Sequence, residues 1–173
     1  MKHTKWKEYV EGVGNGSIVA GRLIKLAVKR FNSFMDRDDM YFDEDEVDRA
    51  VDFISIIRHF LGKSAGKNFI LEPWQEWFIA FILGFKWKDT GYRVVRNVYF
   101  QVSRKTGKDS LAAAIALYML IVDGEASPEI ACLANSREQA RVLFKYITQY
   151  AKSIDGKGKI LKEYRNYITM PSN

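Results

Sequence analysis

The sequence predicts an α/β fold, because apolar runs typical of buried strands alternate with segments of helical spacing. Residues 94–102 are almost continuously apolar, and residues 129–134 form a shorter apolar run. Helix-patterned segments follow them, over residues 109–122 and 136–152, and Ser136 with Gln139 forms a capping box at the start of the second segment. This order predicts a parallel sheet with helices packed on it. Residues 167–170 are the candidate for a third strand.

The amino-terminal part of the chain is predicted to be helical. Apolar side chains recur over residues 18–34 at spacings that place them on one helix face. Asp43 and Glu46 form an acidic capping pair before another helix, which is expected to run to about residue 61. A glycine-bounded stretch at residues 62–66 then ends this helix.

The predicted domain boundary falls at that stretch. Residues 1–66 form a helical region with 11 Lys or Arg and 11 Asp or Glu, whereas residues 67–173 hold 16 basic and 10 acidic residues. The net charge of +6 therefore lies entirely in the second part. A basic excess suits a nucleotide or nucleic acid partner, although ordinary solubility charge explains it equally well.

The amino-acid composition limits the classes of protein to which the chain can belong. Hydrophobic residues make up 47% of the 173-residue chain, which is enough for a packed core and excludes a disordered protein. The single cysteine excludes a disulfide framework. We see no signal peptide and no uncharged apolar run long enough to span a membrane, so a cytoplasmic protein is expected.

A further helix is predicted to begin at Pro73, because proline suits the first turn of a helix. Aromatic residues follow it at helical spacing, and residues 84–91 are expected to form a loop. Gln75 lies in the first turn of this helix, beside Trp74.

The junction between the first predicted strand and its helix holds a Gly-Lys pair, Gly107-Lys108. Four other Gly-Lys pairs occur in the chain, so the dipeptide alone is a weak signal. At a strand-to-helix junction, however, free amides and the helix dipole favour a polyphosphate, and Lys108 adds a full positive charge. The usual loop has Gly-x-x-x-x-Gly-Lys-Ser/Thr; here Val102 replaces the first glycine and Asp109 replaces the hydroxyl residue.

Four blocks of sequence, taken in order, resemble the ATPase part of tailed-bacteriophage terminase large subunits. These blocks are 71–79 (LEPWQEWFI), 103–108 (SRKTGK), 111–117 (LAAAIAL) and 134–140 (ANSREQA). The helical lead-in, with residues 21–27 and 41–46, is also similar. The resemblance covers nearly the whole chain, and it is the combination of blocks that is fairly specific.

This resemblance implies a partial RecA-like P-loop ATPase domain that uses ATP and Mg²⁺. The implied function is ATP-driven translocation of viral DNA into a procapsid in the host cytoplasm. The implied partners are double-stranded DNA bound through its phosphates, a terminase small subunit, the portal and other copies of the large subunit; no membrane is involved.

The resemblance also assigns site residues. The implied nucleotide-binding residues are Gln75, Ser103, Arg104, Lys105, Thr106, Gly107, Lys108, Asp109 and Ser110. Lys108 would neutralise the outer phosphates and Arg104 would act as an arginine finger, so these two are the candidate catalytic residues. Arg104 could instead pair with a surface acid. Gln75 would read the adenine edge, or it is simply a polar residue on an amphipathic helix.

Asp109 is the candidate metal ligand, because a carboxylate suits Mg²⁺, although its charge opposes phosphate unless the metal lies between them. Ser110 is the alternative, about 100° further around the helix. We find no Asp-Glu pair at a strand end after the loop. We therefore expect a fragment that binds nucleotide without turning it over. A helicase-like ATPase fragment and a non-catalytic nucleotide- or partner-binding module remain the alternatives.

Overall fold

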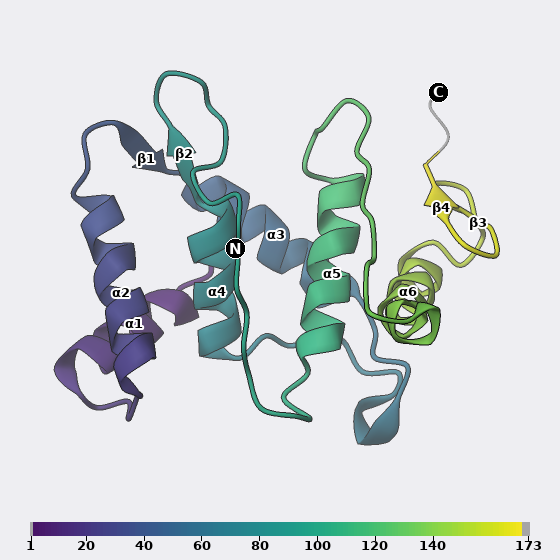
Figure 1. Cartoon of the computed structure of the whole chain (residues 1–173), viewed down its shortest axis with the longest axis horizontal. Helices are drawn as coiled ribbons and strands as arrows, with labels where there is room; N and C mark the ends of the chain where they lie inside the picture. The colour runs from purple at the N-terminus through teal and green to yellow at the C-terminus, as the bar shows by residue number, and fades with distance from the viewer. Residues whose placement is uncertain (1, 171–173) are drawn as a thin grey trace. The chain divides into compact units, whose positions relative to one another are not determined.

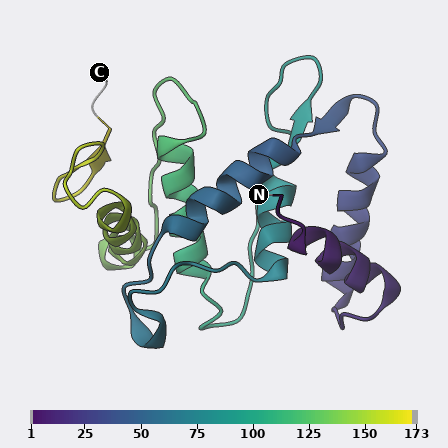
Figure 2. The same ribbon diagram turned by 180° about the vertical axis from the view of Figure 1, so that it is seen from behind.

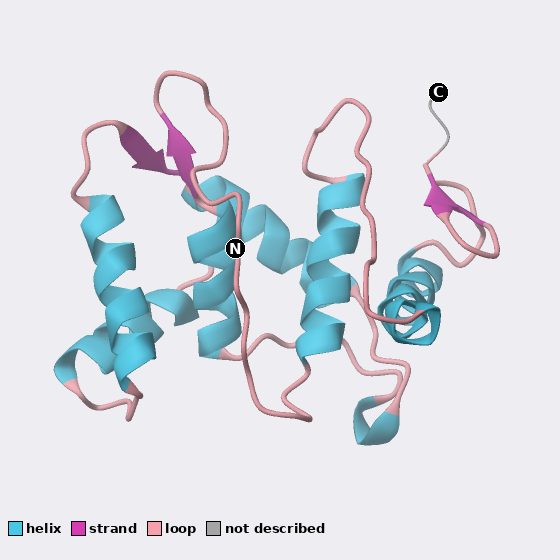
Figure 3. Cartoon of the chain, viewed as in Figure 1, coloured by secondary structure: helices cyan, strands magenta, loops and turns pink. Residues whose placement is uncertain are grey.

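The computed structural model describes residues 2–170 (Figure 1). Its helices are α1 (Lys5–Asn15), α2 (Arg22–Met35), α3 (Glu44–Ile56), α4 (Pro73–Leu83), α5 (Lys108–Ile121) and α6 (Arg137–Ile154), with a 3-10 turn, η1 (Gly62–Ser64). The strands are β1 (Met40–Phe42), β2 (Phe85–Trp87), β3 (Lys162–Glu163) and β4 (Ile168–Thr169). Helices and strands are both present, with long connections between several of them (Figure 3).

The chain forms two compact units, each built from two separate segments. Unit 1 contains Met1–Asp52 and Leu71–Phe100, and unit 2 contains Phe53–Ile70 and Gln101–Asn173. The predicted domain boundary at residue 66 remains a prediction.

Unit 1 is organised around aromatic side chains. Phe31 on α2 is 1% exposed, and its ring centroid lies 5.1 Å from that of Phe85 and 5.5 Å from that of Phe81. Trp6 and Phe42 lie 5.6 and 5.7 Å away. Three of these four pairs meet edge to face, which suits the aromatic quadrupole. Phe31 therefore joins α1, α2, α4 and the β1–β2 pair; the crossing of α1 and α2 is visible from behind (Figure 2).

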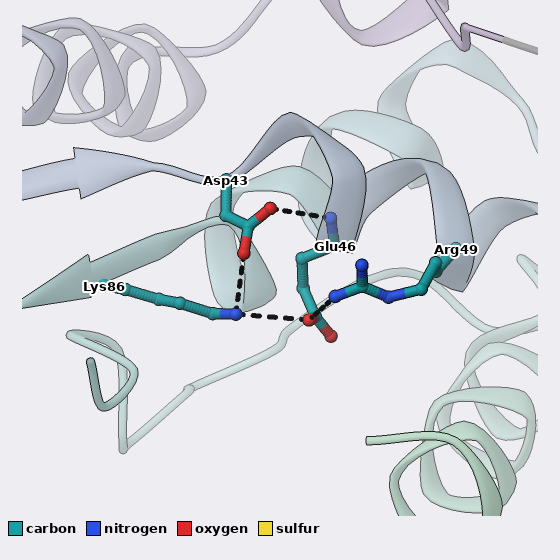
Figure 4. A network of polar contacts seen from close by, with 4 residues as sticks. All are labelled: Asp43, Glu46, Arg49 and Lys86. Atoms are coloured by element: carbon teal, nitrogen blue, oxygen red, sulfur yellow. Dashed lines mark hydrogen bonds and ion pairs between the residues drawn. The ribbon is translucent and has the colours of Figure 1, made fainter. Parts of the chain in front are cut away.

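A charged network holds the start of α3 against β2 (Figure 4). One carboxylate oxygen of Asp43 accepts the Glu46 amide (2.9 Å), as the capping pair predicts, and the other accepts from Lys86 Nζ (2.8 Å). Lys86 Nζ also donates to Glu46 Oε2 (3.2 Å), which accepts from Arg49 as well (2.6 Å). Glu46 is buried, so these cations replace the water that its carboxylate loses.

This network makes the stability of unit 1 sensitive to acid. Burial by itself would raise the pKa of Asp43, but the hydrogen bonds from Lys86 and the Glu46 amide outweigh it and hold the pKa below its ordinary value. A depressed carboxyl pKa stabilises the fold above the unfolded pKa, near 3.9, and the contribution is lost as pH falls through the folded pKa. We expect Asp43→Asn to lower the free energy of unfolding by about 1–2 kcal/mol at pH 7 and to flatten its fall at acid pH.

The measurement is urea unfolding at a series of pH values, followed by tryptophan fluorescence. All four tryptophans, at positions 6, 74, 77 and 87, lie in unit 1, so this signal reports unit 1 directly. Asp45→Asn is the control, because Asp45 is in the same acidic turn and outside the network shown in Figure 4. An Asp43→Asn variant with the pH profile of the wild type would contradict the prediction.

Unit 2 is built on the packing of α5 against α6. Leu111, Leu117 and Tyr118 on α5 are fully buried, as is Tyr150 on α6. The first segment of the unit, Phe53–Ile70, adds Phe69, whose ring lies 6.2 Å from that of Tyr150. This core fixes the two helices whose amino-terminal ends carry the polar motifs of the sequence.

A turn held by one carboxylate follows α6. Asp155 Oδ1 accepts from the Lys159 amide (2.9 Å), and Oδ2 accepts from the amides of Ile160 (2.7 Å) and Leu161 (2.8 Å). These backbone hydrogen bonds, from the Leu161 amide first, hold the pKa of Asp155 below its ordinary value. The chain then forms the antiparallel pair β3–β4.

The parallel sheet predicted from the apolar runs is absent from residues 2–170. No strand is assigned to residues 94–102 or 129–134, and Tyr99 and Leu133 are 89% and 91% exposed. A strand requires a neighbour to exchange backbone hydrogen bonds. The first run instead begins beside β2, where the Val94 amide donates to the Phe85 carbonyl (2.9 Å).

Other boundaries differ as well. The helix expected to reach residue 61 ends at Ile56, and the predicted loop 84–91 contains β2, which pairs antiparallel with β1. Residues 168–169 do form a strand, but it pairs antiparallel with β3. Each β1 or β2 strand has only three residues, so neither presents enough alternation to be recognised alone.

The predicted helices are confirmed, with some boundaries shifted. The helix at Pro73 is α4, the helix after Gly107 is α5, and the helix capped by Ser136 is α6. The Ser136 hydroxyl oxygen accepts from the Gln139 amide at 3.3 Å, as the capping box predicts. In the described part of the chain, no helix is both long and apolar enough to cross a lipid bilayer.

Candidate functional site

The predicted phosphate loop lies directly before α5. Gly107 is the residue before the helix and has φ +81°, a left-handed conformation that glycine adopts without strain. The helical hydrogen bonds begin with the Leu111 amide donating to the Gly107 carbonyl (2.9 Å). The amides of Lys108, Asp109 and Ser110 therefore have no partner inside the helix and carry the positive end of its dipole.

The backbone of the loop alternates in the sign of φ. Lys105 has φ +68° and Gly107 has φ +81°, whereas Arg104 and Thr106 have negative φ. Alternation of this kind turns successive N–H groups into a concave nest that suits an anion. Among the described residues Lys105 is the only one other than glycine with positive φ. Such a conformation costs about 1–3 kcal/mol and is concentrated at ligand-binding sites.

Two hydroxyl groups stabilise this shape from within. The Thr106 hydroxyl donates to the Ser103 carbonyl oxygen (2.7 Å), and the Ser110 hydroxyl donates to the Gly107 carbonyl oxygen (2.7 Å). Both hydroxyl groups donate to carbonyl oxygens of the loop, so the loop amides stay free to donate to another acceptor. Ser103 and Thr106 thus shape the turn.

The loop borders a pocket of about 320 Å³. Its lining residues are Arg104, Lys105, Gly107, Lys108, Asp109, Ser110 and Tyr146. Six of these seven are residues that the sequence predicts for nucleotide binding. The structure thus brings most of the predicted loop residues to one small concave site within unit 2.

The charges of this pocket are not neutralised within the protein. Arg104, Lys105 and Lys108 are exposed, and their side chains make no hydrogen bond or ion pair with any described residue; the same is true of the Asp109 side chain. The expected alternative for Arg104, pairing with a surface acid, is therefore not seen in residues 2–170. Three cations and one carboxylate leave a net positive site that favours a multivalent anion.

Tyr146 and Tyr150 on α6 form the aromatic side of this region. Tyr146 lines the pocket, and its ring lies 6.1 Å from that of the buried Tyr150. Burial raises the pKa of the Tyr150 hydroxyl to about 12, against the opposing effect of the Ser110 hydroxyl. Tyr146 is not among the residues that the sequence predicts for the site; its four-residue spacing to Tyr150 on one face of α6 is the signal that could have indicated it.

Gln75 belongs to unit 1, whereas the loop belongs to unit 2. Its side chain is 6% exposed, and its Oε1 accepts from the Glu72 amide (2.9 Å) at the start of α4. This bond is half of a capping box and gives Gln75 a structural role. Its contact with adenine stays a prediction.

Unit 2 has a second hollow of about 980 Å³, which α5, α6 and residues 165–170 border. Its lining is mostly apolar, but it includes Arg137, Arg141 and Arg165. Arg137 donates to the Asn166 side chain (3.3 Å) and so ties the β3–β4 turn to the start of α6. No group of three or more His, Cys, Asp or Glu residues in the described chain is placed to hold a metal ion.

Comparison with known families decides what this loop belongs to. The family model described as terminase large subunit, ATPase domain, matches residues 73–171, which is more than half of the chain. The chain belongs to the terminase large subunit family. No curated protein and no solved structure matches it.

The match to residues 73–171 includes the predicted phosphate loop. It begins at Pro73, the first residue of α4, and includes α5, α6 and both hairpin strands of unit 2. The sequence resemblance to terminase large subunits is thereby confirmed. An ATPase domain implies the use of a nucleotide, and the pocket at residues 104–110 is the described feature whose charge and backbone suit one.

Proposed function

We propose that the chain is the nucleotide-binding part of the motor that packages viral DNA, and that its 103–110 loop holds the triphosphate of ATP. The observation that carries the proposal is the concave run of amides beside three unpaired cations, at the start of a helix in a terminase ATPase domain. Each of these features favours the same polyanion.

The roles of the loop residues follow from their chemistry. Lys108 is a flexible point charge that neutralises the outer phosphates, and the amides of Gly107 and Lys108 donate hydrogen bonds to the inner phosphate oxygens. Arg104 lines the same pocket and has a guanidinium group that can pair with two phosphate oxygens at once. It is the residue that we assign to stabilise charge on the transferred phosphoryl group.

Asp109 fits a bound Mg²⁺ ion. It is the only carboxylate that lines the pocket among the described residues, and hard oxygen donors are what Mg²⁺ prefers. Mg²⁺ would neutralise charge on the phosphate oxygens, and its presence between Asp109 and the phosphates would remove their repulsion. Ser110 remains the alternative ligand: its hydroxyl donates to the Gly107 carbonyl oxygen, and the lone pairs of its oxygen stay available to a metal ion.

Turnover requires more than this pocket provides. Hydrolysis needs a group that orients or activates water, and the pocket contains no second carboxylate in the part of the chain that the structure describes. We therefore propose that the 173-residue chain binds ATP without hydrolysing it steadily.

The wider role remains part of the proposal. The family implies double-stranded DNA, a small subunit, a portal and further copies of the large subunit as partners, in the cytoplasm of the infected host. Arg137, Arg141 and Arg165 are cations of unit 2 that would suit DNA phosphates. Residues 2–170 form no parallel sheet, so a RecA-like sheet is a proposal only; it rests on the exposed apolar residues of 94–102 and 129–134, which are of the kind that a buried strand would cover.

Hydrogen–deuterium exchange tests the proposal directly. On addition of ATP with Mg²⁺, amide exchange in residues 104–110 is expected to slow at least about tenfold, because the amides that bind phosphate become protected and the loop around them is held in place. The Gly-Lys pairs at residues 62–63 and 156–157 are internal controls, since they have the same dipeptide outside this setting.

Equal exchange at residues 104–110 with and without ATP would refute nucleotide binding at the loop. Steady ATP hydrolysis by the purified chain would refute the proposal that it binds without turnover. If ATP slows amide exchange at residues 104–110 equally with and without Mg²⁺, the metal role of Asp109 is refuted but the loop assignment stands.

A further inference from the structure

Tyr146 comes from a different element of the chain than the other residues that line the loop pocket. The others all lie between Arg104 and Ser110, whereas Tyr146 comes from the middle of α6. It is also the only aromatic residue in the lining of this pocket, within the described chain. The pocket therefore has a charged wall made by the loop and one flat aromatic surface.

Neighbouring rings hold Tyr146 in place. Its ring centroid lies 5.0 Å from that of Phe60 and 6.1 Å from that of Tyr150, with interplanar angles of 70° and 77°. Edge-to-face contacts are favourable for aromatic rings. Tyr150 is fully buried, so Tyr146 is anchored to the core of unit 2 while remaining half-buried itself. A ring that is fixed in advance loses little conformational freedom when a ligand contacts it.

The two sides of the pocket suit two parts of a nucleotide. The triphosphate carries the negative charge, so the loop amides and the cations at positions 104, 105 and 108 attract it. The nucleoside carries a flat, weakly polar base, which a ring contacts favourably. At about 320 Å³ the pocket is near the lower limit for small-molecule sites, which leaves the nucleoside close to the lining.

We propose that the base or ribose of the bound nucleotide packs against the Tyr146 ring. This inference rests on the proposed function and deepens it, because it names the residue that distinguishes a nucleoside triphosphate from a bare polyphosphate. Since stacking on an aromatic ring tolerates different bases, Tyr146 contributes affinity for the nucleoside and little choice among bases.

Calorimetric titration of the full chain with MgATP and with magnesium tripolyphosphate tests the inference. Tyr146→Ala and Tyr146→Leu are expected to weaken MgATP binding about tenfold and to leave tripolyphosphate binding within about twofold of the wild type. Tyr146→Phe keeps the ring and should bind MgATP within about twofold of the wild type. Tyr164→Ala is the matched control, because Tyr164 is a partly exposed tyrosine of unit 2 outside the pocket lining.

Tyr146→Leu tests the contact between ring and nucleotide separately from the packing of α6, because leucine retains most of the apolar volume against Phe60 and Tyr150. Thermal unfolding monitored by circular dichroism shows which variants are folded. The inference is wrong if Tyr146→Leu binds MgATP like the wild type, if it weakens both ligands equally, or if Tyr146→Phe loses as much MgATP affinity as Tyr146→Ala.

The same titrations keep this inference distinct from the proposed function. A wild-type chain that binds neither ligand would refute the nucleotide site itself. The outcome that refutes only the role of Tyr146 has two parts. The wild-type chain binds both ligands through Lys108, and Tyr146→Leu and Tyr146→Ala bind both ligands as tightly as the wild type.

Discussion

Replacement of Lys108 by alanine is expected to lower the affinity for ATP about 10- to 100-fold. Lys108 is the first residue of α5, lines the pocket, and has no ion-pair partner among the described residues. Its ammonium group is therefore available to the phosphates without breaking an existing contact. Charge-assisted hydrogen bonds of this type are roughly twice as strong as neutral ones.

The stability of the fold should not fall in this variant. A cation in the first turn of a helix opposes the positive end of the helix dipole, so its removal is neutral or stabilising by a few tenths of a kcal/mol. A loss of ATP affinity with an unchanged melting temperature would therefore report the site and not unfolding. Titration calorimetry at one fixed ionic strength provides the affinity, since salt screens exposed charges.

Lys157→Ala is the matched control for this substitution. Lys157 also follows a glycine, is exposed and lies in unit 2, but it is in a turn after α6. Lys108→Arg should retain part of the affinity, because the charge remains and its geometry changes. Wild-type ATP affinity in Lys108→Ala would remove the main physical support for the loop.

The largest expected effect on stability comes from Phe31→Ala. Phe31 is 1% exposed and contacts four other rings in unit 1, from α1, α4 and both strands of the β1–β2 pair. Truncation of a buried phenylalanine removes its transfer free energy and leaves a cavity, at a cost of about 3–5 kcal/mol. That cost is a large fraction of the stability of a typical domain.

Urea unfolding followed by tryptophan fluorescence measures this loss, because Trp6 contacts Phe31 directly and every tryptophan lies in unit 1. Leu23→Ala is the control on the same helix; Leu23 is 78% exposed, so its truncation should change stability by less than about 0.5 kcal/mol. If Phe31→Ala does not fold, Phe31→Leu should still fold with a loss of about 1–2 kcal/mol. Equal effects of Phe31→Ala and Leu23→Ala would contradict the central position of Phe31.

The helices could be predicted from the sequence because their signals are local. Asp43 with Glu46, and Ser136 with Gln139, lie within one helical turn of each other, and in both pairs the predicted capping bond forms. Apart from residues 168–169, which lie in the predicted strand 167–170, the strands could not be predicted, because a strand depends on a partner that is distant in sequence. Met40 pairs with Trp87 across 47 positions, and no short pattern at either end announces the other.

Only part of the lining of the candidate site could be predicted from the sequence. The residues at 104–110 were found because a strand-like run, a Gly-Lys pair and a helix follow one another without a gap. Their grouping around one pocket agrees with the prediction, while their binding and catalytic roles remain proposals. Tyr146 was missed because it reaches the pocket only through the packing of α6 on α5, which a linear motif does not encode.

The turn at Asp155 shows what an occupied set of backbone amides looks like in this chain. There the protein supplies its own anion, and three amides are satisfied whatever the solution contains. Among the described residues, the amides of the turn before α5 have no such internal acceptor, and the hydroxyl groups of Thr106 and Ser110 bind only its carbonyl groups. If the loop binds a nucleotide as proposed, these amides would gain an acceptor and the turn would become more rigid. Nucleotide binding would then change the local stiffness of unit 2 without any large movement.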